Sequence, residues 1–260
     1  MFSRFFNTNR SGRSFGKNRV VVVAVAAAVT AMAGITMAAG KTSSKIIYRD
    51  NFTGSKKLGT LNGSKPTVDN GPSATWIAPT SKHSGWSAGG YFNANTPRVG
   101  RSTAMLKFTP KPGHIYTLSA TVSLTKGANS AAYLAIGFLS SVNRYNLTYG
   151  WDLKHVHYGF PSASPWALAR ISDGNATYFT GPGLAGGGGF SIPKNGNLTN
   201  NTLTLVLNTK GKTWTYQVYD NGKLGSGDPI ALPAKTQITA VGMQGASAVG
   251  RVSNFELTSR

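Results

Sequence analysis

Residues 116–124 read YTLSATVSL, and this stretch decides the fold class. Its apolar residues alternate strictly with serine and threonine, so that one face carries Tyr116, Leu118, Ala120, Val122 and Leu124. Alternation with a period of two predicts an antiparallel strand with one buried face. Residues 133–139 are more continuously apolar and predict a strand at the centre of a sheet.

Turn signals place further strands on either side of this one. Asp173-Gly174 separates strands expected at 167–172 and 175–180, and Asn221-Gly222 separates strands expected at 213–220 and 223–224. Both dipeptides supply the positive φ angles of a two-residue type I′ turn. The alternating leucines Leu203, Leu205 and Leu207 and the segments 238–243 and 252–257 predict three more strands.

The pattern as a whole predicts an all-β protein. Strand-like segments number about a dozen, and no helical period supplies the crossovers of an α/β fold. With 32 glycines and 12 prolines, the chain is rich in residues that end strands. We expect residues 41–260 to form one antiparallel two-sheet β-sandwich.

The first 40 residues have the organisation of a secretory signal. Five basic residues and no acid precede an uncharged stretch at 20–39, and the small-residue triplet Ala31-Met32-Ala33 precedes Gly34. These are the parts of a cleavable signal peptide, with cleavage expected near 33/34 or 39/40. The alternative is an uncleaved leader, because 20 apolar residues can just span a bilayer. Localisation is therefore predicted as secreted or cell-surface, whether extracellular or periplasmic.

The charge balance predicts anionic partners. The chain has 27 Lys and Arg against 7 Asp and Glu, a net charge of +20. Without residues 1–40, 22 basic and 7 acidic residues leave +15. Such an excess attracts acidic polysaccharide, lipopolysaccharide, teichoic acid or nucleic acid, or serves solubility alone. No nucleic-acid recognition motif is present, and cysteine is absent, which excludes disulfides and thiolate metal sites.

Both ends of the expected domain resemble a known family. Residues 47–54 read IYRDNFTG, residues 252–258 read VSNFELT, and residues 214–222 read WTYQVYDNG. These segments resemble the concanavalin A-like, laminin-G-like jelly roll, and residues 45–260 can be laid on that pattern. The chain is also similar to secreted single-domain bacterial proteins of this fold, although it stops at Arg260 where many of those continue into a sorting tail. The resemblance implies two sheets, adjacent terminal strands and often a glycan on the concave sheet.

Glycoside hydrolysis is disfavoured by the acidic residues. It requires two carboxylates flanking the scissile bond, but Glu256 is the only glutamate and no acid lies within three residues of another. Polysaccharide lyase activity remains an alternative, because such an enzyme needs a proton acceptor and a cation for the uronate. The residues that could supply them are His155, His157, Tyr158, Arg144 and Arg170. We expect no enzymatic activity.

Aromatic and basic residues gather in 143–170, which predicts a ligand-binding face. Sugar rings stack on aromatic side chains, while amides and charged groups bind their hydroxyls. Tyr145, Tyr149 and Trp151 share a strand face that suits the core. The candidate ligand-binding residues are Tyr158, Trp166, Arg144, Arg170, His155 and His157, with a second patch at Trp76 and Trp86.

Metal binding is predicted only as an alternative. His155 and His157 share a strand face but have no evident third ligand, so surface histidines are the simpler interpretation. Asp50 and Asn254, near the first and last strands, could supply oxygen ligands to a structural calcium ion. No other cofactor is expected.

The sequence predicts a secreted, non-catalytic glycan-binding or adhesive module that favours anionic polymers. The alternatives are a structural envelope or matrix protein with non-specific electrostatic binding and, less favoured, a lyase acting on acidic glycans. Membrane contact is expected only through an uncleaved leader.

Overall fold

The computed structural model describes twelve segments within one compact unit, Thr42–Arg260. They are residues 43–53, 59–78, 86–88, 90–93, 101–125, 133–139, 165–172, 175–180, 198–225, 229–234, 236–246 and 249–260. The predicted signal peptide at 1–40 lies outside these residues, so its cleavage stays a prediction. No helix long and apolar enough to cross a bilayer occurs in the described segments.

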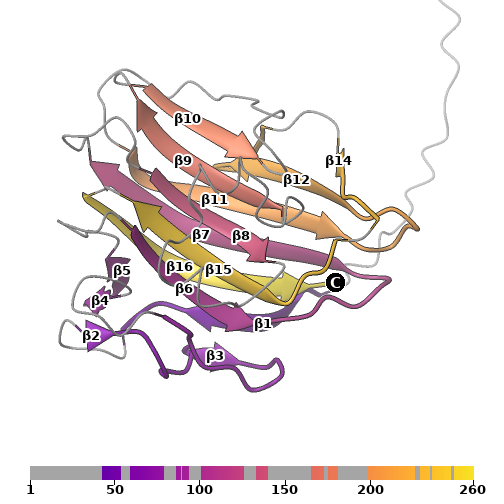
Figure 1. The fold of residues 1–260 in the computed structure, drawn as a ribbon, viewed down its shortest axis with the longest axis horizontal. Helices are drawn as coiled ribbons and strands as arrows, with labels where there is room; N and C mark the ends of the chain where they lie inside the picture. The colour runs from indigo at the N-terminus through magenta and orange to yellow at the C-terminus, as the bar shows by residue number, and fades with distance from the viewer. Residues whose placement is uncertain are drawn as a thin grey trace, which may run out of the picture. The chain divides into compact units, whose positions relative to one another are not determined.

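The described chain forms two antiparallel sheets that lie one behind the other in Figure 1. Sheet A has eleven strands and sheet B has five. The sequence prediction of an all-β, two-sheet sandwich is therefore confirmed.

Sheet A has the long strands β7 (Ile115–Thr125), β11 (Leu198–Asn208) and β16 (Val249–Ser259) at its centre. The order β13-β12-β11-β7-β16-β5-β4-β2 runs across it, with β1 also paired to β16 and β3, and β14 paired to β12. The remaining strands of sheet A are β1 (Lys45–Asp50), β2 (Gly59–Thr60), β3 (Val68–Asp69), β4 (Trp86–Ala88), β5 (Tyr91–Asn93), β12 (Thr215–Asp220), β13 (Lys223–Leu224) and β14 (Ile230–Ala231).

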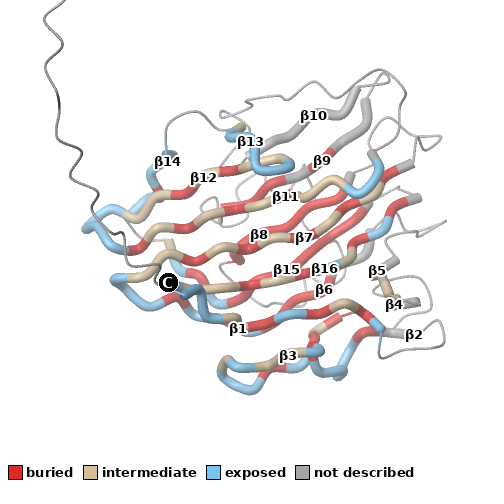
Figure 2. Tube along the Cα trace, turned by 180° about the vertical axis from the view of Figure 1, so that it is seen from behind, coloured by how far each residue is buried: buried red, intermediate tan, exposed pale blue. Residues whose placement is uncertain are grey.

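Sheet B has the order β10-β9-β8-β15-β6. Its strands are β6 (Arg101–Lys107), β8 (Tyr133–Leu139), β9 (Trp166–Ser172), β10 (Asn175–Thr180) and β15 (Ala240–Ala246). Consecutive residues of β8 and β15 are buried, as expected for central strands, and the tube of Figure 2 is continuously red there.

The core lies between the facing sheets. On β7, the five residues predicted to face inward are at most 3% exposed, whereas the intervening serines and threonines are half-buried. Leucines of β11 and Tyr216 and Val218 of β12 extend the same buried layer, and sheet B contributes Leu134, Ile136 and Phe138 from β8. The alternation read from the sequence is the alternation of the core.

Two features expected from the sequence are present in sheet A. Asn221 and Gly222, between β12 and β13, have φ angles of 47° and 77°, the left-handed pair of a type I′ turn. Strand β1 pairs antiparallel with β16, from Lys45 opposite Ser259 to Asp50 opposite Phe255. The two ends of the compact unit are therefore adjacent, as the resemblance implied.

Candidate functional site

Four of the predicted ligand-binding residues, Arg144, His155, His157 and Tyr158, lie outside the described residues. Two others are placed only by their backbone. Trp86 begins β4 and pairs with Asn93 and Thr60, while Arg170 in β9 pairs with Tyr133 and Thr177. Their part in ligand binding stays a prediction.

Trp76 lies in the core rather than on a surface patch. It is 1% exposed, and its ring packs edge-on against Phe255 with ring centroids 5.2 Å apart. Its Nε1 donates a hydrogen bond of 2.6 Å to Oδ2 of Asp50. A tryptophan so enclosed cannot stack on a sugar. Trp76 is therefore not part of an exposed ligand-binding patch.

Asp50 is the polar centre of this core cluster. Its carboxylate accepts hydrogen bonds from the backbone N of Phe52 at 2.8 Å, from Trp76, and from Oγ1 of Thr67 at 3.1 Å. Burial raises the pKa of Asp50, and the three hydrogen bonds oppose that rise. Asn254, in contrast, is exposed, has a positive φ of 51°, and directs Nδ2 toward Oγ1 of Thr121.

These contacts do not support the predicted calcium pair. The Asp50 oxygens already accept protein donors, and Asn254 lies on the exposed side of β16. Within the described segments, no group of three or more His, Cys, Asp or Glu side chains is placed to hold a metal ion.

Trp166 is also enclosed. It begins β9, pairs with Gly137 of β8, and is 5% exposed. A Cβ added to Gly137 would lie 2.9 Å from Cβ of Trp166, so the two strands approach closely at this pair. The tryptophan therefore does not offer an open platform to a ligand in this structure.

One end of the sandwich presents two loops that a buried threonine holds together. Thr209 follows β11 and is 1% exposed. Its Oγ1 donates a 2.7 Å hydrogen bond to the carbonyl of Lys111 and accepts one of 3.0 Å from the backbone N of His114. The loop between β6 and β7 is thus fixed against the loop between β11 and β12, although Lys111 and Thr209 are 98 residues apart in sequence.

The start of β1 and the C-terminal residue Arg260 lie at this same end of the sandwich. Backbone hydrogen bonds link Arg260 with Ile115 in both directions, and Lys45 at the start of β1 pairs with Ser259. The hydroxyl of Tyr48 donates to the carbonyl of Lys107, the last residue of β6. Burial raises the pKa of Tyr48 to about 12, so this hydroxyl stays protonated and keeps its role as a donor.

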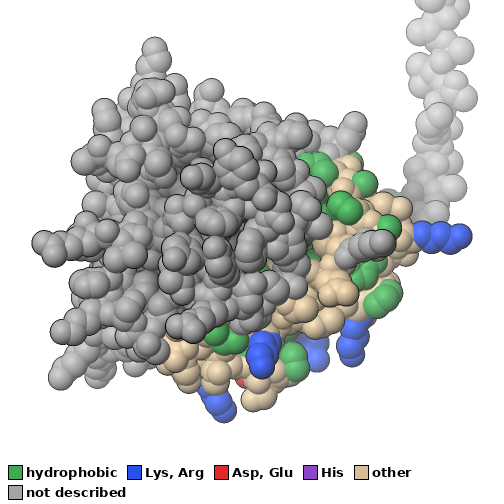
Figure 3. Space-filling view, viewed as in Figure 1, with side chains coloured by type: hydrophobic (Ala, Val, Ile, Leu, Met, Phe, Trp, Pro, Cys, Tyr) green, Lys and Arg blue, Asp and Glu red, His purple; other side chains and the backbone are tan. Residues whose placement is uncertain are grey.

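We call this end of the sandwich the basic end. It is defined by six exposed cationic residues, Lys45, Lys107, Lys111, Lys210, Lys212 and Arg260. The acidic residues among the described segments lie elsewhere: Glu256 pairs with Arg49, Asp50 and Asp69 lie by β1 and β3, and Asp220 is at the far end of β12. In Figure 3, blue side chains recur along the right and lower margin of the described surface, where red is scarce.

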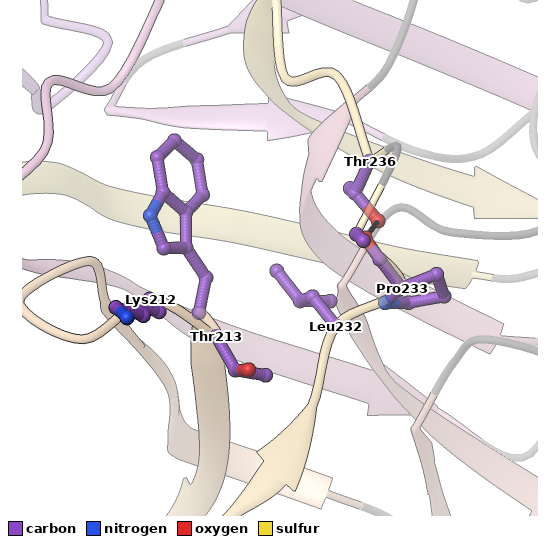
Figure 4. A pocket seen from close by; sticks show the side chains of 7 residues that line it. Lys212, Thr213, Leu232, Pro233 and Thr236 are labelled. Atoms are coloured by element: carbon purple, nitrogen blue, oxygen red, sulfur yellow. Dashed lines mark hydrogen bonds between the residues drawn. The ribbon is translucent and has the colours of Figure 1, made fainter.

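A pocket opens beside this basic end. It encloses about 190 Å³ and is lined by Lys212, Thr213, Trp214, Leu232, Pro233, Ala234 and Thr236. Figure 4 shows Lys212 and Thr213 on one side of the pocket and Leu232, Pro233 and Thr236 on the other. The backbone N of Leu232 donates to the carbonyl of Trp214 at 2.8 Å, and Oγ1 of Thr236 donates to the carbonyl of Pro233 at 2.8 Å, which fixes both walls.

Sequence reasoning did not find this pocket. Trp214 entered the sequence pattern only as the first residue of the segment 214–222. The available signal was the run KGKTW at 210–214, where two lysines and a tryptophan share a turn. The second wall, formed by residues 232–234 and Thr236, follows β14, which pairs with β12.

The comparisons with known proteins concern the fold. No protein family matches the chain, and no curated protein matches it in sequence. Similar solved structures include an endo-1,3-beta-glucanase from Streptomyces sioyaensis, with 13% identity over 84% of this chain and 97% of that chain and a TM-score of 0.47. The alginate lyase Aly36B shares 13% identity over 83% of this chain and 98% of its own, with a TM-score of 0.47.

A lectin, UEA-II complexed with galactose, is similar at 10% identity, with 74% of this chain and 95% of that chain covered and a TM-score of 0.40. The fold class of this chain rests on its own strand pairing, in which two antiparallel sheets form an all-β sandwich. At these identities, the likeness assigns neither a ligand nor a reaction to this chain.

One prediction is corrected by these comparisons. We expected a protein without enzymatic activity, but the similar structures include a glucanase and a lyase, which are enzymes. The expectation of a non-catalytic protein is therefore withdrawn.

Proposed function

We propose that this protein is a secreted or cell-surface β-sandwich that binds acidic polysaccharide through its basic end. The observation that carries the proposal is the basic end itself, where six exposed cations are gathered by loops that Thr209 and the β1–β16 pairing hold in place. The net charge of +15 over residues 41–260 supports it. The leader at 1–40 supports export to where such polymers occur.

The physical reason is the fixed position of the charges. A polyanion that lies across the basic end displaces counterions and meets several ammonium groups at once, and such binding weakens steeply as salt rises. Rigid loops lower the entropy that binding must overcome. A chain with the same charge spread evenly would attract polyanions without preferring any surface.

Two matched double variants test the proposal. Lys111→Gln with Lys210→Gln removes two charges from the basic end, whereas Lys65→Gln with Lys223→Gln removes two exposed lysines from other parts of the unit. Both lower the net charge equally. Binding of polygalacturonate and of a neutral polysaccharide is measured by calorimetry at low and high salt.

We expect the basic-end variant to lose about tenfold or more in polygalacturonate affinity at low salt, since each lysine near an anionic surface contributes about 1 kcal/mol. The control variant should change affinity far less. Equal losses in both variants would mean that binding follows total charge alone, which is the behaviour of a structural matrix protein with non-specific electrostatic binding.

A further inference from the structure

We infer that the pocket beside the basic end binds a single pyranose residue that carries a carboxylate, as a subsite for the acidic polysaccharide. This inference rests on the proposed function. It adds where on the protein one sugar residue binds and which side chains recognise it. The described residues that line the pocket are one aromatic side chain, one lysine, two threonines and apolar residues, including Pro233.

The size of the pocket limits its occupant. Its volume of about 190 Å³ is smaller than the roughly 300–1,000 Å³ of pockets that enclose drug-sized ligands. It therefore has room for one sugar ring rather than for a folded peptide or a nucleotide. Because it opens at the end of the sheets, the rest of a polymer can continue across the neighbouring loops.

The lining matches the two sides of a sugar. Trp214 is half-buried, packs its inner part against the core, and offers apolar surface to the pocket together with Pro233. The C–H face of a pyranose is apolar and packs on such surfaces. Thr213 and Thr236 supply hydroxyl groups on opposite walls for the ring hydroxyls.

Lys212 determines the charge preference. It is exposed at the pocket rim, and none of the described residues that line the pocket is acidic. An ammonium group forms a charge-assisted hydrogen bond with a carboxylate, which a neutral sugar cannot offer. The nearby Lys210 and Lys111 add to the positive field without lining the pocket.

The pocket walls are held before any ligand binds. The Leu232–Trp214 backbone hydrogen bond and the turn closed by Thr236 on Pro233 fix the two sides relative to each other. Trp214 directly precedes β12, whose pairing with β11 and β14 anchors it in sheet A. A preformed pocket loses little conformational freedom when it takes up a sugar.

The test uses the full chain and two short ligands, trigalacturonate and its fully methyl-esterified form, which keeps the rings but lacks the charge. Lys212→Gln is compared with Lys223→Gln, an exposed lysine of β13. We expect Lys212→Gln to weaken trigalacturonate binding about fivefold or more, Lys223→Gln to leave it within about twofold, and the methyl ester to bind the two variants equally.

Trp214→Phe and Trp214→Ala provide the second measurement, with melting temperatures recorded for each. Phenylalanine should retain most of the binding of the methyl ester and alanine should lose it, because the ring face is the contact. The inference is overturned if Lys212→Gln and Lys223→Gln bind trigalacturonate alike, or if folded Trp214→Ala binds both ligands like the wild type. Either result leaves salt-sensitive binding of long polygalacturonate intact, so failure of the pocket is distinguishable from failure of the proposed function.

Discussion

Replacing Trp76 with phenylalanine should destabilise the sandwich much more at neutral pH than in acid. The indole Nε1 donates a 2.6 Å hydrogen bond to Oδ2 of Asp50, and both residues are buried, at 1% and 4% exposure. Phenylalanine keeps an aromatic ring against Phe52 and Phe255 but removes the donor. A buried carboxylate oxygen then remains without that partner.

The expected loss in the free energy of unfolding has two parts. Loss of the hydrogen bond to a buried, charged acceptor costs about 1–3 kcal/mol. The smaller ring leaves a cavity of roughly 40 Å³, which adds about 1 kcal/mol at 24 cal/mol per Å³. We therefore expect the free energy of unfolding to fall by about 2–4 kcal/mol near neutral pH.

The pH dependence separates the two parts. Burial raises the pKa of Asp50 above its ordinary value of 3.8, and the hydrogen bonds from Phe52, Trp76 and Thr67 lower it. Since the folded pKa is raised, the folded state binds the proton more strongly than the unfolded state. The stability that this proton provides is complete below pH 3.8 and is lost as the pH rises through the folded pKa.

Loss of the Trp76 donor raises the folded pKa further, so the variant loses more stability than the wild type as the pH rises. Near about pH 3.5 only the cavity cost of about 1 kcal/mol should remain. Urea unfolding followed by far-ultraviolet circular dichroism at about pH 3.5 and about pH 8 measures both values.

Phe255→Leu is the matched control, because it makes a cavity against the same Trp76 ring while it leaves the hydrogen-bond donors of Asp50 in place. Its cost should be the same at both pH values. Equal destabilisation by Trp76→Phe in acid and at neutral pH would refute the reasoning, and it would assign the effect to packing alone.

Three further predictions concern other parts of the chain. Gly242→Ala should lower the free energy of unfolding by about 1–3 kcal/mol or more, because the new Cβ would lie 2.5 Å from the carbonyl oxygen of Ala104. A Cβ added to Gly222 would meet no atom within 4 Å, but the residue has a φ of 77°. Gly222→Ala should therefore cost only about 1 kcal/mol in the same denaturation assay. Thr209→Val should cost about 1–3 kcal/mol and speed amide hydrogen exchange at His114, whose backbone N loses its acceptor; unchanged exchange would contradict the role of Thr209 in joining the loops. Mass spectrometry of exported protein should find the N-terminus near residue 34 or residue 40, and a membrane-bound chain that retains Met1 would favour the uncleaved leader instead.

Much of the fold could be predicted because its signals are local. The alternation in 116–124 needs only the two-residue repeat of a strand, and it predicted which residues of β7 are buried. The Asn221-Gly222 turn likewise follows from the backbone preferences of two residues, and its φ angles confirm it. The central strand β7 and this hairpin turn therefore came from the sequence, whereas β6 (Arg101–Lys107) did not.

Local signals could not predict whether Trp76 and Trp166 lie in the core or on a binding surface. Trp76 and Trp166 suit a sugar-binding face as well as a core, because an indole is apolar over its ring and polar at one atom. Only the meeting of distant strands decided the matter: Asp50 of β1 supplies the acceptor for Trp76, and the pairing of β8 with β9 places Trp166 against Gly137.

The sequence by itself determined the sandwich class, the central strands, the Asn221-Gly222 turn and an excess of positive charge. The tertiary structure decided where that charge gathers and what lies beside it. The hydrogen bond from Thr209 to the carbonyl of Lys111 holds the β6–β7 loop against the loop that carries Lys210 and Lys212. The pairing of β14 with β12 places residues 232–234 and Thr236 opposite Trp214 as the second wall of the pocket. The physical reason is that alternation and turn dihedrals act over a few residues, whereas a binding surface depends on hydrogen bonds and burial between segments that are far apart in the chain.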